Sequence, residues 1–330
     1  MKPGRKNLIT DVPGILVGNA QDKELLSGCT VLRSTTLLTG GISIVGGAPG
    51  TRDTELLGPD KTVSYIDGLV LSGGSAFGLD SASGVTKYFK EQKKGFKVGN
   101  HIIPIVPAAV LFDLSAGGNH NWTTNPYVAL GYEAAMSAST TFSIGSFGAG
   151  TGATTVNLKG GLGSASLELS DGTIIGAVVA VNPIGSVVVG DSPHFWAAPF
   201  EMMEEFGGKG IASNFDVSKK QETKLDMKSA TTIGIIATNA TLTKAEVSRL
   251  AAAAQDGVAR SIYPSHTAMD GDLIFGVSTN DISPRISIKD TIELENTASI
   301  CMARAIARAV FSAKSSSRDK LPVWRNKYEI

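Results

Sequence analysis

The sequence predicts a single α/β domain in which stacked β-sheets are covered by helices. Two runs, residues 173–181 and 231–238, are continuously apolar and rich in β-branched residues, which is typical of strands buried on both faces. Strand and helix patterns alternate irregularly, and no segment has the composition of a linker between domains. We therefore expect one domain over residues 1–330, a sandwich of several layers and not a doubly wound sheet.

In the N-terminal half, short strands are separated by glycine-rich turns. Residues 29–32 and 41–45 are predicted to form a pair of strands, and residues 66–71 form another strand. A glycine loop then leads into an amphipathic helix, and such a loop can bind an oxyanion through its N–H groups. Ser75 lies in this loop, but Phe77 occupies the last glycine position of a nucleophile elbow. A packing turn is therefore favoured over a nucleophilic Ser75.

In the C-terminal half, the patterns are longer. Asp171-Gly172 predicts a hairpin turn that leads into the strand at 173–181. Thr243 and Glu246 form a capping box that opens a helix. The other predicted elements are helices at 125–137, 199–206 and 293–313, and a strand at 273–279.

The composition is that of an ordinary globular protein and excludes several functional classes. Hydrophobic residues make up 42% of the chain, charged residues 18%, and the formal net charge is zero. A neutral chain lacks the basic surface that binds nucleic acid or an anionic membrane. No stretch approaches the roughly 18 apolar residues of a membrane span, and the N-terminus lacks the apolar core of an export signal. We therefore expect a soluble, cytoplasmic protein.

We expect no disulfide framework, metal or cofactor. Cys29 and Cys301 are far apart and form no CxxC motif. The four histidines are widely separated and match no zinc pattern. Residues 148–153 fit the G-x-G-x-x-A dinucleotide fingerprint, but the residues that follow are poor helix formers, so we do not interpret this loop as a dinucleotide site.

The most informative stretch is the end of a polar run, residues 218–228, just before the strand that begins at Thr231. A hydroxyl residue at the start of a buried strand, directly after a flexible segment, is the layout of an N-terminal nucleophile. Cleavage before Thr231 would expose an α-amine with a pKa of roughly 7.7–8.0. That amine can act as general base for its own hydroxyl. Because threonine is common in strands, the rest of the chain has to support this hypothesis.

Two other positions fit it. Asn182 ends a predicted strand and is followed by Pro183, so its amide can point at a developing oxyanion, although an Asx-turn explains it equally well. Asp270 and Asp272 enter a core strand from a turn, which could also be an Asp-Gly turn alone.

These features, in this order, resemble peptidase family S58. That family includes the L-aminopeptidase/D-esterases, the β-peptidyl aminopeptidases and the nylon-oligomer (6-aminohexanoate) endo-hydrolases. The segments that carry the resemblance span nearly the whole chain and are residues 71–79, 148–153, 159–163, 181–183, 231–233 with 237–239, and 266–267 with 269–272.

The resemblance implies a four-layer αββα fold, shared with the ornithine acetyltransferases. It also implies a precursor that cleaves itself between Ala230 and Thr231, giving a large chain (1–230) and a small chain (231–330). The cleaved units are expected to form a homo-oligomer, a tetramer.

Site roles follow from the same resemblance. Thr231 would be the nucleophile, Asn182 would stabilise the oxyanion, and Asp270 and Asp272 would orient the amine and hydroxyl of Thr231. A lysine that supports the nucleophile in the nylon-hydrolase branch aligns near residues 157–159, and we assign it to Lys159.

Substrate contacts are expected from Phe112, Ser75 and His266. Two positions depart from the family pattern. Ala230 precedes the nucleophile where relatives often carry Asn or Gly, and Phe112 stands where characterised enzymes have a Tyr whose hydroxyl assists the oxyanion or substrate. Loss of one oxyanion donor costs on the order of 10²–10³ in rate.

The sequence therefore predicts an autoprocessing N-terminal-threonine amidohydrolase that works through an acyl-enzyme. Expected substrates are short peptides, amino-acid amides or esters, or ω-amino-acid oligomers, with no nucleic-acid or membrane partner. Two alternatives stay open: an acyltransferase on the same fold, and a non-catalytic binding protein that remains a single chain.

Overall fold

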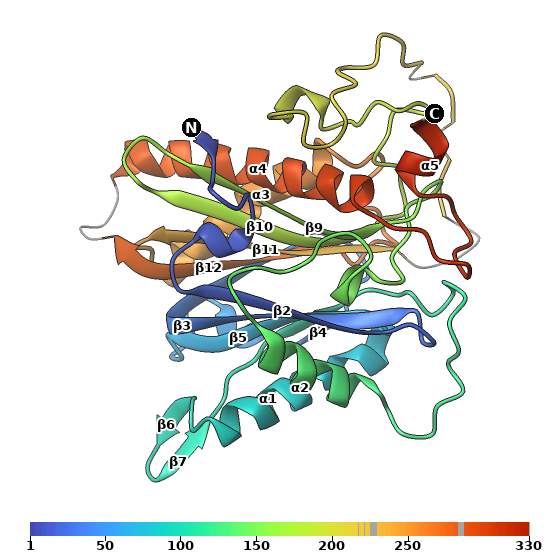
Figure 1. Cartoon of the computed structure of the whole chain (residues 1–330). Helices are drawn as coiled ribbons and strands as arrows, with labels where there is room; N and C mark the ends of the chain where they lie inside the picture. The colour runs from blue at the N-terminus through green and yellow to red at the C-terminus, as the bar shows by residue number, and fades with distance from the viewer. Residues whose placement is uncertain (217, 221, 225–229, 283–286, 330) are drawn as a thin grey trace.

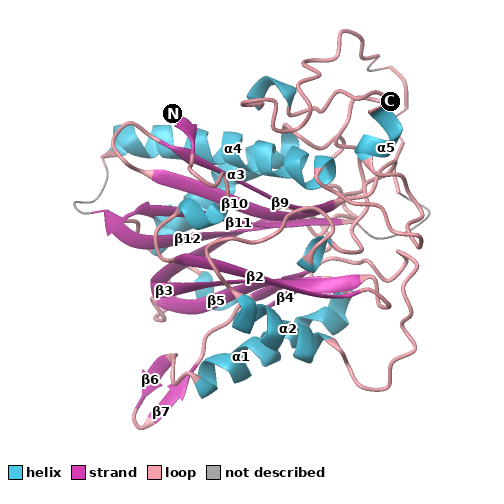
Figure 2. Cartoon of the chain, viewed as in Figure 1, coloured by secondary structure: helices cyan, strands magenta, loops and turns pink. Residues whose placement is uncertain are grey.

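The described elements of the computed structural model form four layers, helix–sheet–sheet–helix (Figures 1 and 2). The structure describes all residues except 217, 221, 225–229, 283–286 and 330. Part of the predicted polar run at 218–228 therefore lies outside the described residues. The layered arrangement confirms the predicted αββα fold.

The upper sheet holds the strands that flank the site. β9 (Gly161–Glu168) and β10 (Ile174–Asn182) form an antiparallel hairpin, which confirms the turn predicted at Asp171-Gly172. β11 (Thr231–Ala240) pairs antiparallel with β10 and parallel with β12 (Leu273–Ile282). Helices α3 (Lys244–Ala259) and α4 (Ile288–Phe311) cover the outer face, and the capping box at Thr243 opens α3 as predicted.

The lower sheet is built around one very long strand, β3 (Ser27–Ile44). Its first half pairs with β2 (Ile15–Asp22) and β5 (Tyr65–Ser72), and its second half pairs with β12 of the upper sheet. The segments predicted at 29–32 and 41–45 are therefore extended, but the predicted pairing between them is wrong, because both belong to β3. Gly41 lies at a close approach to a helix, because a Cβ on Gly41 would lie 2.6 Å from the backbone nitrogen of Ser248 in α3.

The remaining elements complete the lower layers and the periphery. Helices α1 and α2 cover the outer face of the lower sheet (Figure 1). These elements are α1 (Ser81–Glu91), α2 (Tyr127–Ser137), β1 (Lys2–Pro3), β4 (Thr51–Arg52), β6 (Phe96–Val98), β7 (His101–Ile103), β8 (Ala108–Val110), α5 (Trp324–Tyr328) and single 3-10 turns at Ile9–Asp11, Glu55–Leu57, Ser75–Asp80, Gly148–Gly150 and Ala198–Phe200.

Three hydrophobic cores lie between the four layers. Because successive side chains of a strand point to opposite faces of the sheet, alternate residues contribute to different cores. On β10, Ala177 and Val179 pack toward α3 and α4, whereas Val178 and Ala180 pack between the two sheets. A third core lies between the lower sheet and helices α1 and α2. The continuous apolar runs in the sequence are thus the strands that have a core on each side.

The helix predicted at 199–206 is wrong, because only one 3-10 turn forms there, at Ala198–Phe200. The Glu201 carboxylate accepts hydrogen bonds from the backbone N–H groups of Phe206 (2.8 Å) and Gly208 (3.0 Å). Met203 and Glu204 have positive φ angles of 54° and 53°, which a right-handed helix does not allow. Hydrogen bonds between the Glu201 side chain and nearby backbone N–H groups thus take the place of the helical backbone hydrogen bonds.

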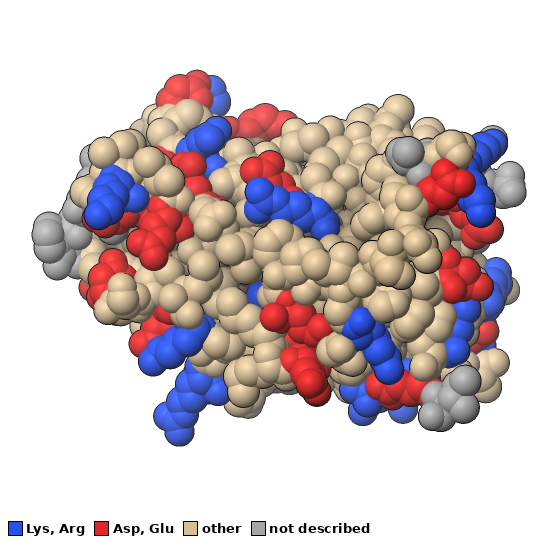
Figure 3. Space-filling model, turned by 90° about the horizontal axis from the view of Figure 1, so that it is seen from above, with Lys and Arg blue, Asp and Glu red and all other residues tan. Residues whose placement is uncertain are grey.

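The surface carries mixed charge. Figure 3 shows acidic and basic side chains interspersed on the face viewed from above, over α4, without a large field of one sign. In the part of the chain that the structure describes, no helix is both long and apolar enough to cross a bilayer.

Gly163 sets the distance between β9 and α4, which yields a stability prediction. A Cβ at this position would lie 1.9 Å from the carbonyl oxygen of Ala305. We expect Gly163→Val to lower the free energy of unfolding by about 3 kcal/mol through overpacking, measured by urea denaturation. The exposed Ile292→Ala on the same helix should change it by less than about 0.5 kcal/mol. Equal effects of the two substitutions would contradict this account of the helix–sheet spacing.

Candidate active site

Thr231 lies where three chain segments meet. It is the first residue of β11 and is 6% exposed. Its partner across the antiparallel pair is Asn182, the last residue of β10. Just before it, Ala230 forms a parallel bridge with Asp270, in the turn that leads into β12. Three of the residues predicted for the site are thus brought together by strand register alone.

The carbonyl of Ala230 is held between two donors. Its oxygen accepts a hydrogen bond from the Thr231 hydroxyl (Oγ1–O 2.5 Å) and another from the backbone N–H of Gly271 (3.0 Å). The hydroxyl therefore lies against the peptide group that precedes it. The Gly271 N–H points at the oxygen that would become negative if that carbonyl were attacked, which is the arrangement of an oxyanion donor.

Asp270 is completely buried and fully hydrogen-bonded. One carboxylate oxygen accepts from the backbone N–H of Ile184 (3.1 Å), and the other accepts from the N–H (2.9 Å) and hydroxyl (2.7 Å) of Thr267. Burial, and secondly the nearby charge of Asp272, raise the pKa of Asp270. These bonds fix the turn that supplies the Gly271 N–H.

Asp272 connects the strand of the nucleophile to His266. One oxygen accepts from the backbone N–H of Thr232 (2.7 Å), and the other accepts from the backbone N–H (3.1 Å) and contacts Nδ1 (2.9 Å) of His266. Burial opposes protonation of His266, but the hydrogen bond and charge of Asp272 outweigh it, so the pKa of His266 is raised. The structure therefore places His266 behind Asp272, where it holds that carboxylate.

A glycine loop clamps the same turn from the opposite side. The Ala48 N–H donates to the Asp270 carbonyl (2.8 Å), and the Gly46 N–H donates to the Asp272 carbonyl (3.0 Å). A Cβ on Gly46 would lie 2.3 Å from the Asp272 nitrogen, so only glycine allows the two backbones to approach this closely.

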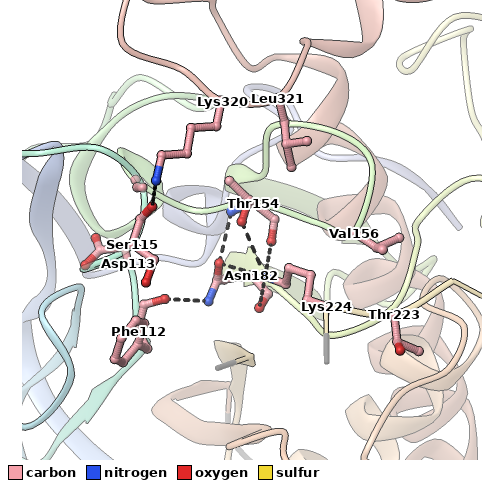
Figure 4. A pocket seen from close by; sticks show the side chains of 12 residues that line it. Phe112, Asp113, Ser115, Thr154, Val156, Asn182, Thr223, Lys224, Lys320 and Leu321 are labelled. Atoms are coloured by element: carbon pink, nitrogen blue, oxygen red, sulfur yellow. Dashed lines mark hydrogen bonds between the residues drawn. The ribbon is translucent and has the colours of Figure 1, made fainter. Parts of the chain in front are cut away.

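The Asn182 side chain faces away from the strand ladder and is bonded at both ends. Its amide nitrogen donates to the Phe112 carbonyl (3.0 Å), and its oxygen accepts from the Thr154 N–H (3.0 Å) and from the ammonium of Lys224 (3.1 Å) (Figure 4). One amide hydrogen satisfies Phe112, which leaves the second for another acceptor. The predicted oxyanion role of Asn182 stays a prediction.

Lys224 lies at this site, although the sequence did not reveal it. Its side chain is buried, with 5% of the residue exposed, and its ammonium also donates to the carbonyl oxygens of Thr154 (2.7 Å) and Asn182 (3.2 Å). Burial lowers the pKa of Lys224 to about 7, and the charge of Asp270 partly opposes that shift. No motif marked this lysine, because it lies in a polar run that contains several others.

Lys159, the lysine predicted to support the nucleophile, makes a different contact. Its ammonium forms an ion pair with the buried carboxylate of Asp319, and its backbone N–H donates to the Pro322 carbonyl (2.8 Å). It therefore anchors the C-terminal segment to the start of β9, and Lys224 is the lysine that contacts Asn182.

A cavity of about 240 Å³ opens beside Asn182 (Figure 4). Its rim is closed on one side by Lys320, whose ammonium donates to the Ser115 carbonyl (2.7 Å). The cavity is lined by Phe112, Asp113, Ser115, Ala116, Gly152, Thr154, Val156, Asn182, Thr223, Lys224, Lys320 and Leu321. Of the predicted substrate contacts, Phe112 lines this cavity, and its role in binding substrate stays a prediction.

Ser75 is outside this lining. It has a positive φ of 52°, and its N–H donates to the Leu111 carbonyl (2.9 Å). The neighbouring Gly74 N–H donates to the buried carboxylate of Asp113 (2.8 Å). The N–H groups of Gly74 and Ser75 are thus engaged in hydrogen bonds within the protein.

The chain is similar throughout its length to known amide hydrolases. The sequence profile of peptidase family S58 matches residues 7–320. An uncharacterized aminopeptidase of Mycobacterium leprae is 38% identical over 94% of this chain and 91% of its own length. A 6-aminohexanoate-oligomer endohydrolase of a Kocuria species is 28% identical over 84% of this chain and 77% of its own.

Two solved structures share the fold. A β-aminopeptidase of a Burkholderia species superposes with a TM-score of 0.75 at 20% identity, covering 99% of this chain and 92% of its own. The L-aminopeptidase D-Ala-esterase/amidase of Ochrobactrum anthropi, described as a variant of the Ntn hydrolase fold, gives 0.71 at 19% identity, covering 97% and 91%.

The raised pKa of His266 predicts a pH-dependent stability. Because the folded state holds this proton more tightly than the unfolded state, the contribution is fully present below the ordinary pKa of about 6.5 and is lost as the pH rises through the raised folded value. We expect the stability advantage of wild type over His266→Gln to shrink across that window. Urea denaturation of both proteins from pH 6 to about pH 9 measures it. Parallel stability profiles would contradict the His266–Asp272 pairing.

Proposed function

The chain belongs to peptidase family S58 and is a hydrolase that acts on amide bonds, and on that premise we propose that it matures by cutting its own chain before Thr231. The observation that supports this best is the Ala230 carbonyl, which lies between the Thr231 hydroxyl and the Gly271 N–H. Nucleophile, electrophile and oxyanion donor are already adjacent in the uncleaved chain.

The proposed self-cleavage is an acyl shift followed by hydrolysis. The Thr231 oxygen attacks the Ala230 carbonyl carbon and loses its proton, the C–N bond breaks, and the Thr231 nitrogen takes up that proton and leaves as an amine, while Ala230 becomes an ester on the Thr231 oxygen. The Gly271 N–H stabilises the oxyanion of that step. Water then hydrolyses the ester, which leaves a carboxylate on Ala230 and a free amine and hydroxyl on Thr231.

In the mature protein, the same residue would attack substrates. The Thr231 amine takes the proton of its own hydroxyl, and the oxygen attacks an amide or ester carbonyl to give an acyl-enzyme. The proton passes to the leaving amine, and water releases the acyl group. The proposed substrates are short peptides, amino-acid amides or esters, and ω-amino-acid oligomers, in keeping with the aminopeptidase and 6-aminohexanoate-oligomer endohydrolase names of the relatives.

The carboxylates have positioning roles in this proposal. Asp270 holds the turn that bears the Gly271 N–H, and Asp272 fixes the start of β11 through the Thr232 N–H. Both carboxylates are completely buried.

Thr231→Ala tests the nucleophile. Without the hydroxyl, neither the acyl shift nor substrate attack is possible, so we expect a single uncut chain on a denaturing gel and hydrolysis of an amino-acid p-nitroanilide at background rate.

Thr232→Val is the matched control, because the buried Thr232 hydroxyl has no hydrogen-bond partner among the described residues and valine has nearly the same shape. This variant should cut itself and hydrolyse like wild type. Self-cutting or hydrolysis by folded Thr231→Ala protein would refute the proposed nucleophile.

A further inference from the structure

The ammonium of Lys224 is enclosed by neutral oxygen atoms. It donates to the Thr154 carbonyl (2.7 Å), to the Asn182 carbonyl (3.2 Å) and to the Asn182 side-chain oxygen (3.1 Å), with the Thr154 hydroxyl at 3.4 Å (Figure 4). We call these four oxygens the ammonium cage. Three donors on an ammonium match such a set, so the cage can bind any primary alkylammonium group.

The neutral oxygens of the cage compensate the buried charge of Lys224 poorly, which argues against a purely structural role for this contact. A buried charge needs compensation, yet the oxygens that contact it are uncharged, and Asp270 attracts it without a hydrogen bond between them being present. Among the described residues, the backbone of Lys224 makes one hydrogen bond, from its N–H to the Ile184 carbonyl (3.1 Å). By comparison, Lys159 pairs directly with a carboxylate. The cage is therefore better suited to exchange its occupant than to stabilise the fold.

The position of the cage relates it to the nucleophile. Asn182 contributes two of its oxygens and is the strand partner of Thr231. The cage opens on the cavity of about 240 Å³, whose walls include Phe112, Gly152 and Val156. A molecule with its ammonium in the cage and its chain in this cavity would thus contact Asn182, the strand partner of Thr231, although Thr231 itself is not part of the cavity lining.

We propose that the ammonium cage is the subsite that binds the free amine of the substrate, and that Lys224 occupies it in the uncleaved chain as an internal substrate mimic. This inference rests on the proposed function, because cleavage after Ala230 frees one end of the segment that carries Lys224. The lysine side chain is a primary amine on a flexible four-carbon stem. The substrates selected by the cage are therefore amides with a primary amine on an apolar arm, such as short ω-amino-acid oligomers.

The alternative is that Lys224 stays in place and assists the reaction with its charge. The two roles predict opposite responses to a small amine. If Lys224 is a placeholder, n-butylamine competes with substrate for the vacated cage. If Lys224 is a catalytic group, n-butylamine restores the activity that its removal destroys.

A binding measurement on uncut protein tests the cage without relying on self-cleavage or hydrolysis. In a Thr231→Ala background, Lys224→Ala empties the cage, and saturating n-butylamine should raise Tm by about 3 °C. n-Butanol, which lacks the charge, should not. Lys224→Met is the matched control, because it also removes the charge but keeps the cage filled by its stem, so n-butylamine should leave its Tm unchanged. Equal Tm shifts in both variants, or none in Lys224→Ala, would overturn the assignment.

Kinetics on cut protein then separates the two roles. We expect n-butylamine to inhibit cut wild-type enzyme competitively, and n-butanol to have no effect. Lys224→Ala should lower the KM for a free-amine anilide about tenfold and leave the KM for an N-acetylated anilide unchanged.

Rescue of Lys224→Ala by n-butylamine, or a loss of kcat on both substrates, would show that Lys224 is catalytic and overturn the placeholder role. Butylamine binding to the uncut variant with no hydrolysis in any protein would retain the cage as an amine site and refute the proposed function alone.

Discussion

The geometry of the candidate site depends on one peptide carbonyl, that of Ala230. Its oxygen is fixed by the Gly271 N–H and touched by the hydroxyl of Thr231, so the bond proposed to break is held against the group proposed to break it. The Gly271 N–H is in turn fixed because the Asp270 carboxylate and the Ala48 N–H determine the path of the turn. Together, these hydrogen bonds fix the position of the start of β11.

The four-layer arrangement explains how the polar groups at the start of β11 can be buried. Two hydrophobic cores, one on each face of the upper sheet, pack against β10, β11 and β12, and the register of these strands places Asn182, Thr231 and Asp270 side by side. Every carboxylate at the site then finds donors among backbone N–H groups and His266, which lowers the cost of burial. The Lys224 ammonium, by contrast, donates to neutral oxygens of Thr154 and Asn182.

Local patterns in the sequence predicted the layered fold and the strand starting at Thr231, because residues buried on both faces give a continuous apolar signal. They failed at β3, which contains both of the segments that were predicted to pair with each other, since the pairing of distant strands leaves no local signature. The contact between Lys224 and Asn182 was missed for the same reason. Lys159 begins a segment that carries the family resemblance, whereas Lys224 lies in a polar run without a motif, and only the tertiary structure shows that Asn182 contacts Lys224.

The central claim is that Thr231 becomes a new N-terminus, and the mass of the purified wild-type chains tests it most directly. Under denaturing conditions, the account predicts two species of roughly 24 and 10 kDa by share of length, with the smaller one beginning at Thr231. A single species of 34.2 kDa after prolonged incubation of folded protein would contradict it.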